Sequence, residues 1–175
     1  MKKRIGLVLV TTFLVLSSLF SISSEQDNLL TIILVRHAEK VLDDSTDPLL
    51  TEKGKARAAE LAYILKHVPL DAVFSTPYIR TRETVLPSAK EKGIKLEYYN
   101  AGSEKELLMR IFNRYKGKKG FVLIAGHSNT LHLFLNFLVG EDLFVPIEDD
   151  IYDNIFFVTA SIPGKATVLH LRYGR

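Results

Sequence analysis

The stretch TIILVRHAEK, Thr31 to Lys40, predicts a buried strand that ends abruptly in two basic side chains. Its first five residues are uncharged and do not alternate with polar residues, which is typical of a strand covered on both faces. Arg36 and His37 follow directly, and Glu39 comes two positions later. Two basic groups at one strand end repel each other unless they face water or negative charge lies nearby. A bound anion can supply that charge.

Strand and helix patterns alternate along the rest of the chain. Strands are expected at 29–36, 72–75, 95–99 and 121–125, and a final hairpin at 155–160 and 166–173. Helices are expected at 51–67, 77–92, 103–116 and 128–139. This order predicts an α/β fold, a three-layer α/β/α sandwich whose mixed, mainly parallel sheet has about six strands. The hairpin adds an antiparallel edge.

Five residues are predicted to mark where helices begin or bend. Thr76 and Pro77 are typical of a helix cap followed by proline in the first turn, and Ser103 and Ser128 are further candidate caps. Pro87 predicts a bend or break within the helix over 77–92.

Three strand ends carry polar groups that point to one ligand. Arg36 and His37 end the first strand, Arg80 lies in the first turn after the second, and His127 ends the strand over 121–125. In open α/β sheets ligands bind beyond the carboxyl ends of the strands. With helix N-termini at the same rim, these residues predict a pocket for a dianion, and phosphate is the obvious candidate.

The N-terminal residues are typical of a secretory signal peptide. Basic residues 2–4 precede an uncharged run, 5–20, and small polar residues follow. This predicts a signal peptide over 1–23, a mature domain over 24–175 and a periplasmic or secreted location. An uncleaved membrane anchor is the alternative, although the run falls short of the ~20 residues that span a bilayer.

Charge and cysteine content exclude several classes. Residues 2–4 account for the formal charge of +3, and the rest of the chain carries 20 basic and 20 acidic side chains. We therefore expect no nucleic-acid partner, and no stable membrane contact once the signal peptide is removed. The chain has no cysteine, which excludes a lipid-modified lipoprotein and a disulfide framework.

The segments LVRHAEK, STPYIRTRET and LIAGHSNT, in this order, resemble the histidine phosphatase superfamily, the phosphoglycerate-mutase-like proteins. The resemblance covers nearly all of the mature chain and implies the phosphoglycerate-mutase-like fold. It implies that His37 is the nucleophile, that Arg36, Arg80 and His127 hold the phosphoryl group, and that no metal or other cofactor is needed. Neutral imidazole is a competent nucleophile near neutral pH if its other nitrogen donates to a fixed acceptor, such as a backbone carbonyl.

A general acid must protonate the leaving oxygen. Larger relatives use a glutamate after the third strand, in a Leu-x-Glu context, and Glu97 in KLEYYN is the nearest match, although the spacer residue is missing. Glu104, Asp47 and Glu39 are rival candidates.

The expected activity is that of a phosphomonoesterase, a histidine acid phosphatase-like phosphoric monoester hydrolase. Its substrate would be a phosphorylated small molecule or an envelope glycan. Mutase activity is not expected, because so short a chain leaves little room for a lid. The alternatives are a catalytically weak phosphate-binding envelope protein and a phosphohistidine protein phosphatase. No oligomeric state is predicted.

Overall fold

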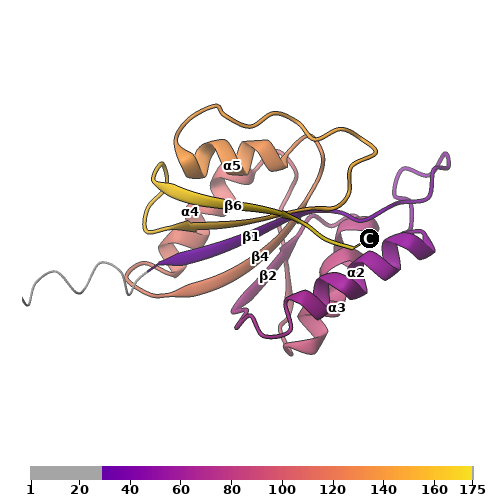
Figure 1. The fold of residues 1–175 in the computed structure, drawn as a ribbon, viewed down its shortest axis with the longest axis horizontal. Coiled ribbons are helices and arrows are strands. Elements are labelled where there is room, and N and C mark those ends of the chain that lie inside the picture. The colour runs from indigo at the N-terminus through magenta and orange to yellow at the C-terminus, as the bar shows by residue number, and fades with distance from the viewer. Residues whose placement is uncertain (1–28, 175) are drawn as a thin grey trace, which may run out of the picture.

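Strand β1 (Leu30–Arg36) lies inside a six-stranded sheet in the computed structural model, which describes residues 29–174. The strand order is β3-β2-β4-β1-β5-β6. Strands β1 to β4 run parallel, and β5 and β6 pair antiparallel at the end of the sheet. The predicted mainly parallel mixed sheet with an antiparallel hairpin at its edge is therefore confirmed (Figure 1).

The elements alternate as the sequence predicts. The other strands are β2 (Ala72–Ser75), β3 (Leu96–Tyr98), β4 (Gly120–Gly126), β5 (Asn154–Ala160) and β6 (Ala166–Arg172). The helices are α2 (Glu52–Ile64), α3 (Ile79–Glu91), α4 (Glu104–Arg114) and α5 (Leu131–Val139). Within residues 29–174, no helix combines the length and apolar character needed to cross a bilayer. The predicted signal peptide, 1–23, lies outside the described residues.

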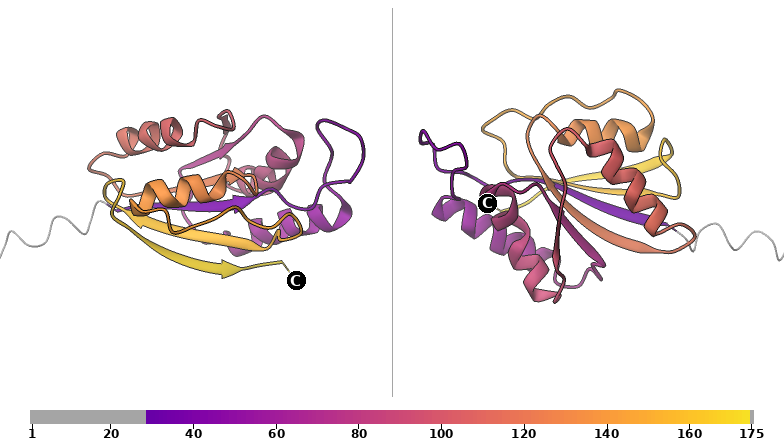
Figure 2. Two further views of the ribbon diagram at one scale, coloured as in Figure 1. Left: turned by 90° about the horizontal axis from the view of Figure 1, so that it is seen from above. Right: turned by 180° about the vertical axis from the view of Figure 1, so that it is seen from behind.

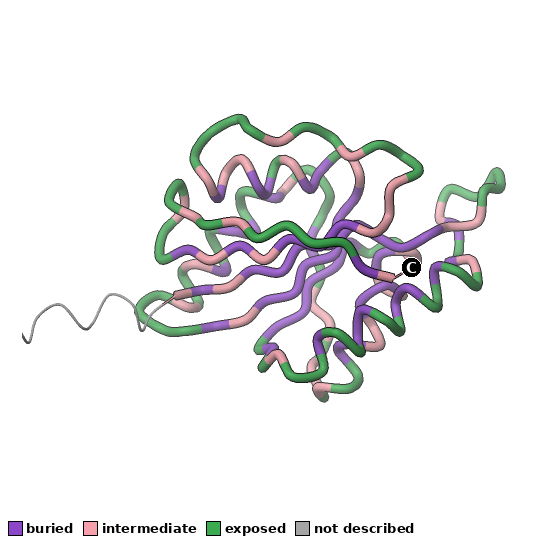
Figure 3. Tube along the Cα trace, in the orientation of Figure 1, coloured by how far each residue is buried: buried purple, intermediate pink, exposed green. Residues whose placement is uncertain are grey.

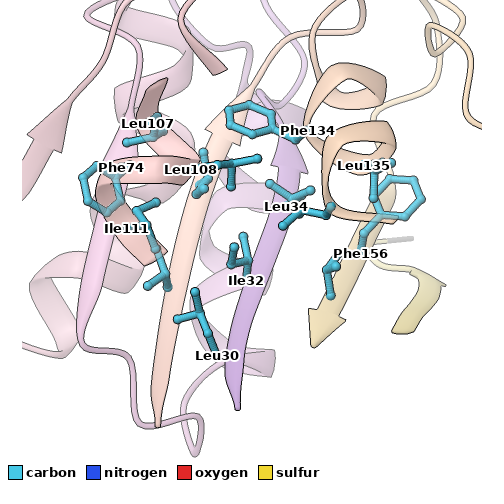
Figure 4. Packing of buried hydrophobic residues seen from close by; sticks show 14 of the residues in the cluster. Leu30, Ile32, Leu34, Phe74, Leu107, Leu108, Ile111, Phe134, Leu135 and Phe156 are labelled. Atoms are coloured by element: carbon cyan, nitrogen blue, oxygen red, sulfur yellow. The ribbon is translucent and has the colours of Figure 1, made fainter. Parts of the chain in front are cut away.

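Side chains of β1 alternate between two apolar layers, because successive strand residues point to opposite faces. Ile32 and Leu34 pack with α4 and α5, together with Phe74 and Phe134 (Figure 4). Ile33 and Val35 pack with α2 and α3 on the other face. Figures 1 and 2 show the sheet between these two helix pairs, which makes the three layers. In Figure 3 the buried segments gather along the central strands.

The register of the central strands fixes where their carboxyl ends meet. Arg36 pairs with Gly126, and Ser75 pairs with Ala125. The backbone N–H of His37 donates to the Gly126 carbonyl at 2.9 Å. The residues that follow β1, β2 and β4 therefore lie at one rim of the sheet.

Two helices begin later than predicted. Helix α3 begins at Ile79 with Tyr78 as N-cap, so Thr76 and Pro77 lie in the turn before it. Helix α5 begins at Leu131 after Thr130. These starts place Thr76 and Ser128 in turns, where their hydroxyls are free to bind other groups.

Two further expectations about the helices were met in part. Ser103 is the N-cap residue of α4, as predicted, but its hydroxyl donates to the Asn100 carbonyl and makes no cap bond. Pro87 lies inside α3, which continues from Ile79 to Glu91, so the helix does not break there.

Candidate active site

His37 and His127 face each other at the rim of the sheet. Their ring centroids lie 5.5 Å apart with the planes at 65°. Both residues are buried, with exposures of 3% and 8%. A phosphoryl-sized ligand can therefore contact both rings at once.

The ring of His37 is held in the tautomer that a nucleophile needs. Its Nδ1 lies 2.9 Å from the Ala38 carbonyl oxygen, which can only accept, so Nδ1 carries the proton and Nε2 keeps its lone pair. Burial lowers the pKa of His37 to about 3, and the charges of Arg36, His127 and Arg80 act in the same direction. The predicted backbone acceptor is thus present, and the neutral ring persists near neutral pH.

Arg36 is fixed by the loop between α5 and β5. Its Nη1 donates to the carbonyls of Glu148 and Ile151, both at 2.9 Å, and its Nη2 lies 3.5 Å from the Asp149 carboxylate. The guanidinium carbon lies 4.2 Å from the centre of the Tyr152 ring. These contacts hold the guanidinium rigidly beside His37, which suits a group that must orient an anion.

Arg80 occupies the first turn of α3, next to Tyr78, whose ring contacts His127. Its Nη1 lies 3.6 Å from Asp47 Oδ1, and its guanidinium stacks 4.4 Å from the centre of the Tyr78 ring. The same Asp47 oxygen accepts the backbone N–H of Ile79 at 2.9 Å. The loop that carries Asp47 therefore supports both the start of α3 and the arginine in its first turn.

Both arginines also leave an N–H group for an outside acceptor. Their Nε atoms are buried, and no residue in 29–174 accepts a hydrogen bond from them. Buried donors without acceptors are rare in folded proteins. Together with the two rings, these groups form a donor-rich cluster, here called the pocket, that suits a phosphate dianion.

The structure does not bring Glu97 to this pocket. Its carboxylate accepts two hydrogen bonds from Arg114, at 2.6 and 2.7 Å, beside the sheet's outer edge strand. The hydrogen bonds and charge of Arg114 outweigh burial and lower the pKa of Glu97. Such a carboxylate is poorly placed to deliver a proton at the site.

The rival carboxylates have different surroundings. Glu104 is buried and accepts the backbone N–H of Gly102. Glu39 accepts two hydrogen bonds from Arg57, at 2.9 and 2.8 Å, and Arg57 also donates to the carbonyl of Tyr173. Asp47 alone of the predicted candidates contacts an arginine of the pocket.

Several residues that shape the site were not predicted. The acceptors for Arg36 are backbone carbonyls at residues 148 and 151, which leave no signature in a sequence. Tyr78 and Tyr152 flank the histidines, with centroids 5.5 Å from His127 and 5.9 Å from His37. Tyr78 lies two residues before Arg80 in the motif STPYIRTRET, and this closeness in sequence could have indicated that it belongs to the site.

Comparison with known proteins matches this arrangement to a family. Residues 32–104, which include Arg36, His37 and Arg80, match the model of the histidine phosphatase superfamily (branch 1). Over these residues the chain is similar to that superfamily. The histidine phosphatase model ends before His127, which the parallel register brings to the same rim.

Phosphoserine phosphatase 1 of Hydrogenobacter thermophilus is 38% identical over 71 residues. That match spans 37% of this chain and 34% of the relative, so it covers about a third of that protein's length.

Solved structures share the histidine phosphatase fold. The protein histidine phosphatase SixA in complex with tungstate matches with a TM-score of 0.67 and 20% identity, over 81% of this chain and 96% of that one. The phosphoglycerate mutase of Bacillus anthracis matches with a TM-score of 0.66 and 15% identity, over 83% and 93%. The phosphoglycerate-mutase-like fold is thereby confirmed.

Proposed function

We propose that this protein hydrolyses phosphate monoesters through a covalent phosphohistidine on His37. The observation that carries the proposal is the bond from Nδ1 of His37 to the Ala38 carbonyl, which leaves Nε2 as a free nucleophile in a pocket of two arginines and a second histidine. Neutral imidazole can attack phosphorus without a separate base.

The reaction has two steps. Nε2 of His37 attacks phosphorus, and the P–O bond to the leaving group breaks, with its electron pair going to the leaving oxygen, which takes a proton from solvent. Water then attacks the phosphohistidine and gives up one proton to solvent, and the P–N bond returns its electron pair to His37. Arg36 and Arg80 stabilise charge on the phosphoryl oxygens in both steps. Loss of one such donor typically lowers the rate about 100- to 1,000-fold.

A phosphohistidine protein phosphatase is the second candidate. The pairing of Glu97 with Arg114 favours it, because imidazole is a better leaving group than an alkoxide and needs less help from an acid. The likeness to SixA supports the same substrate class. The sequence relative supports phosphoserine as a third substrate to be tested.

The decisive experiment uses p-nitrophenyl phosphate and acetyl phosphate with the full mature domain. We expect phosphate release by the wild type, and an acid-labile, base-stable phosphoenzyme after rapid quenching. His37→Ala should abolish both while its circular dichroism and urea midpoint stay close to those of the wild type. His67→Ala, at an exposed position, is the matched control and should keep full activity.

Binding of phosphate without any turnover between about pH 4 and pH 8 would instead support a phosphate-binding envelope protein. Parallel assays with phosphohistidine, phosphoserine and phosphorylated glycan fragments would rank the substrate classes. A preference for phosphohistidine would assign the second candidate.

We also propose that residues 1–23 direct export to the periplasm or beyond. The support is the basic start, the uncharged run and the small residues that follow. N-terminal sequencing of protein from the envelope fraction should begin near Ser24. An intact Met1 would mean that the segment is an anchor.

A further inference from the structure

A chain of buried hydroxyl groups lies behind His127. Nε2 of His127 is 3.0 Å from Thr76 Oγ1, which is 2.6 Å from Thr81 Oγ1. Thr81 Oγ1 in turn lies 2.9 Å from the carbonyl oxygen of Tyr78 and 3.2 Å from that of Thr76. Both threonines are fully buried. Solvent therefore cannot replace any bond in this chain.

The carbonyls at its end set the direction of every donor. A carbonyl oxygen only accepts, whereas a hydroxyl has a single proton to donate. If Thr81 donates to a carbonyl, Thr76 donates to Thr81, and Nε2 of His127 must donate to Thr76. The reverse direction makes one hydrogen bond fewer and leaves two carbonyl oxygens facing the lone pairs of Thr81, which is unfavourable in a buried site. The outward direction is therefore the stable one.

We propose that this relay keeps the proton of neutral His127 on Nε2, so that Nδ1 can donate to a phosphoryl oxygen only after His127 takes up a proton. Thr76 and Thr81 are then positioning residues, and ligand binding is coupled to proton uptake. The proposal rests on the proposed function, because it requires that the pocket bind a phosphoryl dianion. Within residues 29–174, Nδ1 of His127 has no hydrogen-bond partner, which leaves it available to the ligand.

Charges around the ring make the coupling strong. Burial, followed by the charges of Arg80 and Arg36, lowers the pKa of His127 to about 4, so the ring of the free protein is neutral at neutral pH. An unprotonated Nδ1 presents a lone pair to the ligand and repels a dianion. The bound dianion offsets both guanidinium charges and raises the pKa of His127, so one proton passes from solution to Nδ1 as the complex forms.

Other titratable groups also border the ring, and none supplies a fixed donor to Nδ1. They are His37 and Tyr78, whose rings contact His127, and the carboxylates of Asp47 and Asp149, which lie against Arg80 and Arg36.

Sulfate is the probe of choice, because it stays a dianion throughout the range from about pH 5 to about pH 8 in which histidine coupling is measured. Calorimetry in buffers with different heats of ionisation reports the protons taken up. We expect the wild type to take up close to one proton per sulfate, and its affinity to fall about tenfold for each unit of pH increase.

Three variants separate the relay from simple packing. Thr76→Val removes the hydroxyl at nearly constant volume, and Thr76→Ser keeps it. Thr81→Val leaves Thr76 intact but removes its acceptor, so Thr76 turns its proton to Nε2 and His127 carries its own on Nδ1. Both valine variants should bind sulfate with little pH dependence and little proton uptake, and Thr76→Ser should behave as the wild type does.

Nitrogen-15 chemical shifts of the His127 ring read the tautomer directly in the unliganded protein. A wild-type ring protonated on Nδ1, or a sulfate affinity independent of pH, would overturn the relay. Failure of sulfate to bind at any pH would instead overturn the proposed function, while the ring shifts would still test the relay.

Discussion

Glu97 and Arg114 share two hydrogen bonds beside the outermost strand of the sheet, where the carboxylate is pulled away from the two histidines. We predict that Glu97→Gln retains activity within about twofold, because the carboxylate does not reach the substrate. It should lower the free energy of unfolding by less than about 1 kcal/mol, as is usual for a partly exposed pair. Steady-state kinetics with p-nitrophenyl phosphate and urea denaturation measure both effects.

Arg114→Gln is the matched control for Glu97, because it breaks the same pair from the other side. Both variants should show the same activity and the same small loss of unfolding free energy. A loss of about 100-fold or more in Glu97→Gln alone would identify Glu97 as the general acid after all.

Glu39 and Arg57 form a buried pair that ties the segment after His37 to α2 and the C-terminus. Although burial raises the pKa of Glu39, the hydrogen bonds and charge of Arg57 lower it to about 2. Glu39→Gln leaves the guanidinium without its countercharge and should cost about 3 kcal/mol of unfolding free energy near neutral pH. Urea denaturation measures this loss.

Protonation of Glu39 in this pair should lower the stability of the fold in acid. The carboxylate titrates near 4.5 when unfolded and near 2 when folded, so its contribution is complete above pH 4.5 and disappears as the pH falls toward 2. Glu39→Gln should abolish this part of the acid sensitivity. An unchanged acid transition in the variant would show that the pair contributes little.

The two histidines of the site should destabilise the fold at mildly acidic pH. Burial lowers the pKa of His37 to about 3 and of His127 to about 4, from 6.5 in the unfolded chain. Between these values the unfolded chain binds more protons than the folded protein does. The free energy of unfolding should therefore fall as the pH drops from 6.5 to 4. Each ring contributes up to about 1.4 kcal/mol per pH unit.

His37→Asn and His127→Asn each remove one of these titrations. Urea denaturation at a series of pH values should give each variant a shallower dependence than the wild type. Slopes equal to that of the wild type would mean that the folded protein binds these protons.

Asp47 supports Arg80 from a loop remote in sequence. Asp47→Asn keeps an acceptor for the Ile79 N–H but loses the charge beside Arg80. We expect nearly unchanged stability and a fall in kcat/KM of about 3- to 10-fold, because the guanidinium is less well positioned. Asp47→Ala should lose about 1 kcal/mol of stability in addition, as removal of a helix cap does. Equal kcat/KM values for Asp47→Asn and wild type would show that Asp47 does not position Arg80 for the reaction.

The strands and the antiparallel hairpin at the edge followed from the sequence, because uninterrupted apolar runs are a strong signal for central strands. The starts of α3 and α5 did not, since the groups that decide them come from elsewhere. Asp47, not Thr76, binds the first N–H of α3, and the Ser128 hydroxyl donates to Asp149 instead of capping α5. A local pattern cannot anticipate a partner from a distant loop.

The same limit applies to the site. Arginine and histidine at strand ends could be predicted, because parallel register brings such ends together. The placement of Glu97 could not, because it depends on the face of a short edge strand and on Arg114 from another element. The relay behind His127 depends on hydroxyl geometry that spacing alone does not specify.

Strand β1 carries Arg36 and leads directly into His37, yet both of its neighbours, β4 and β5, come from the second half of the chain. During translation β1 therefore emerges long before either edge can be paired, and the central sheet cannot close until Ala160 has left the ribosome. Contacts so distant along the chain form slowly. We expect the central sheet to close only after the segment that ends at Ala160 has been made, and the apolar strands made before it to need shielding from aggregation in the interval.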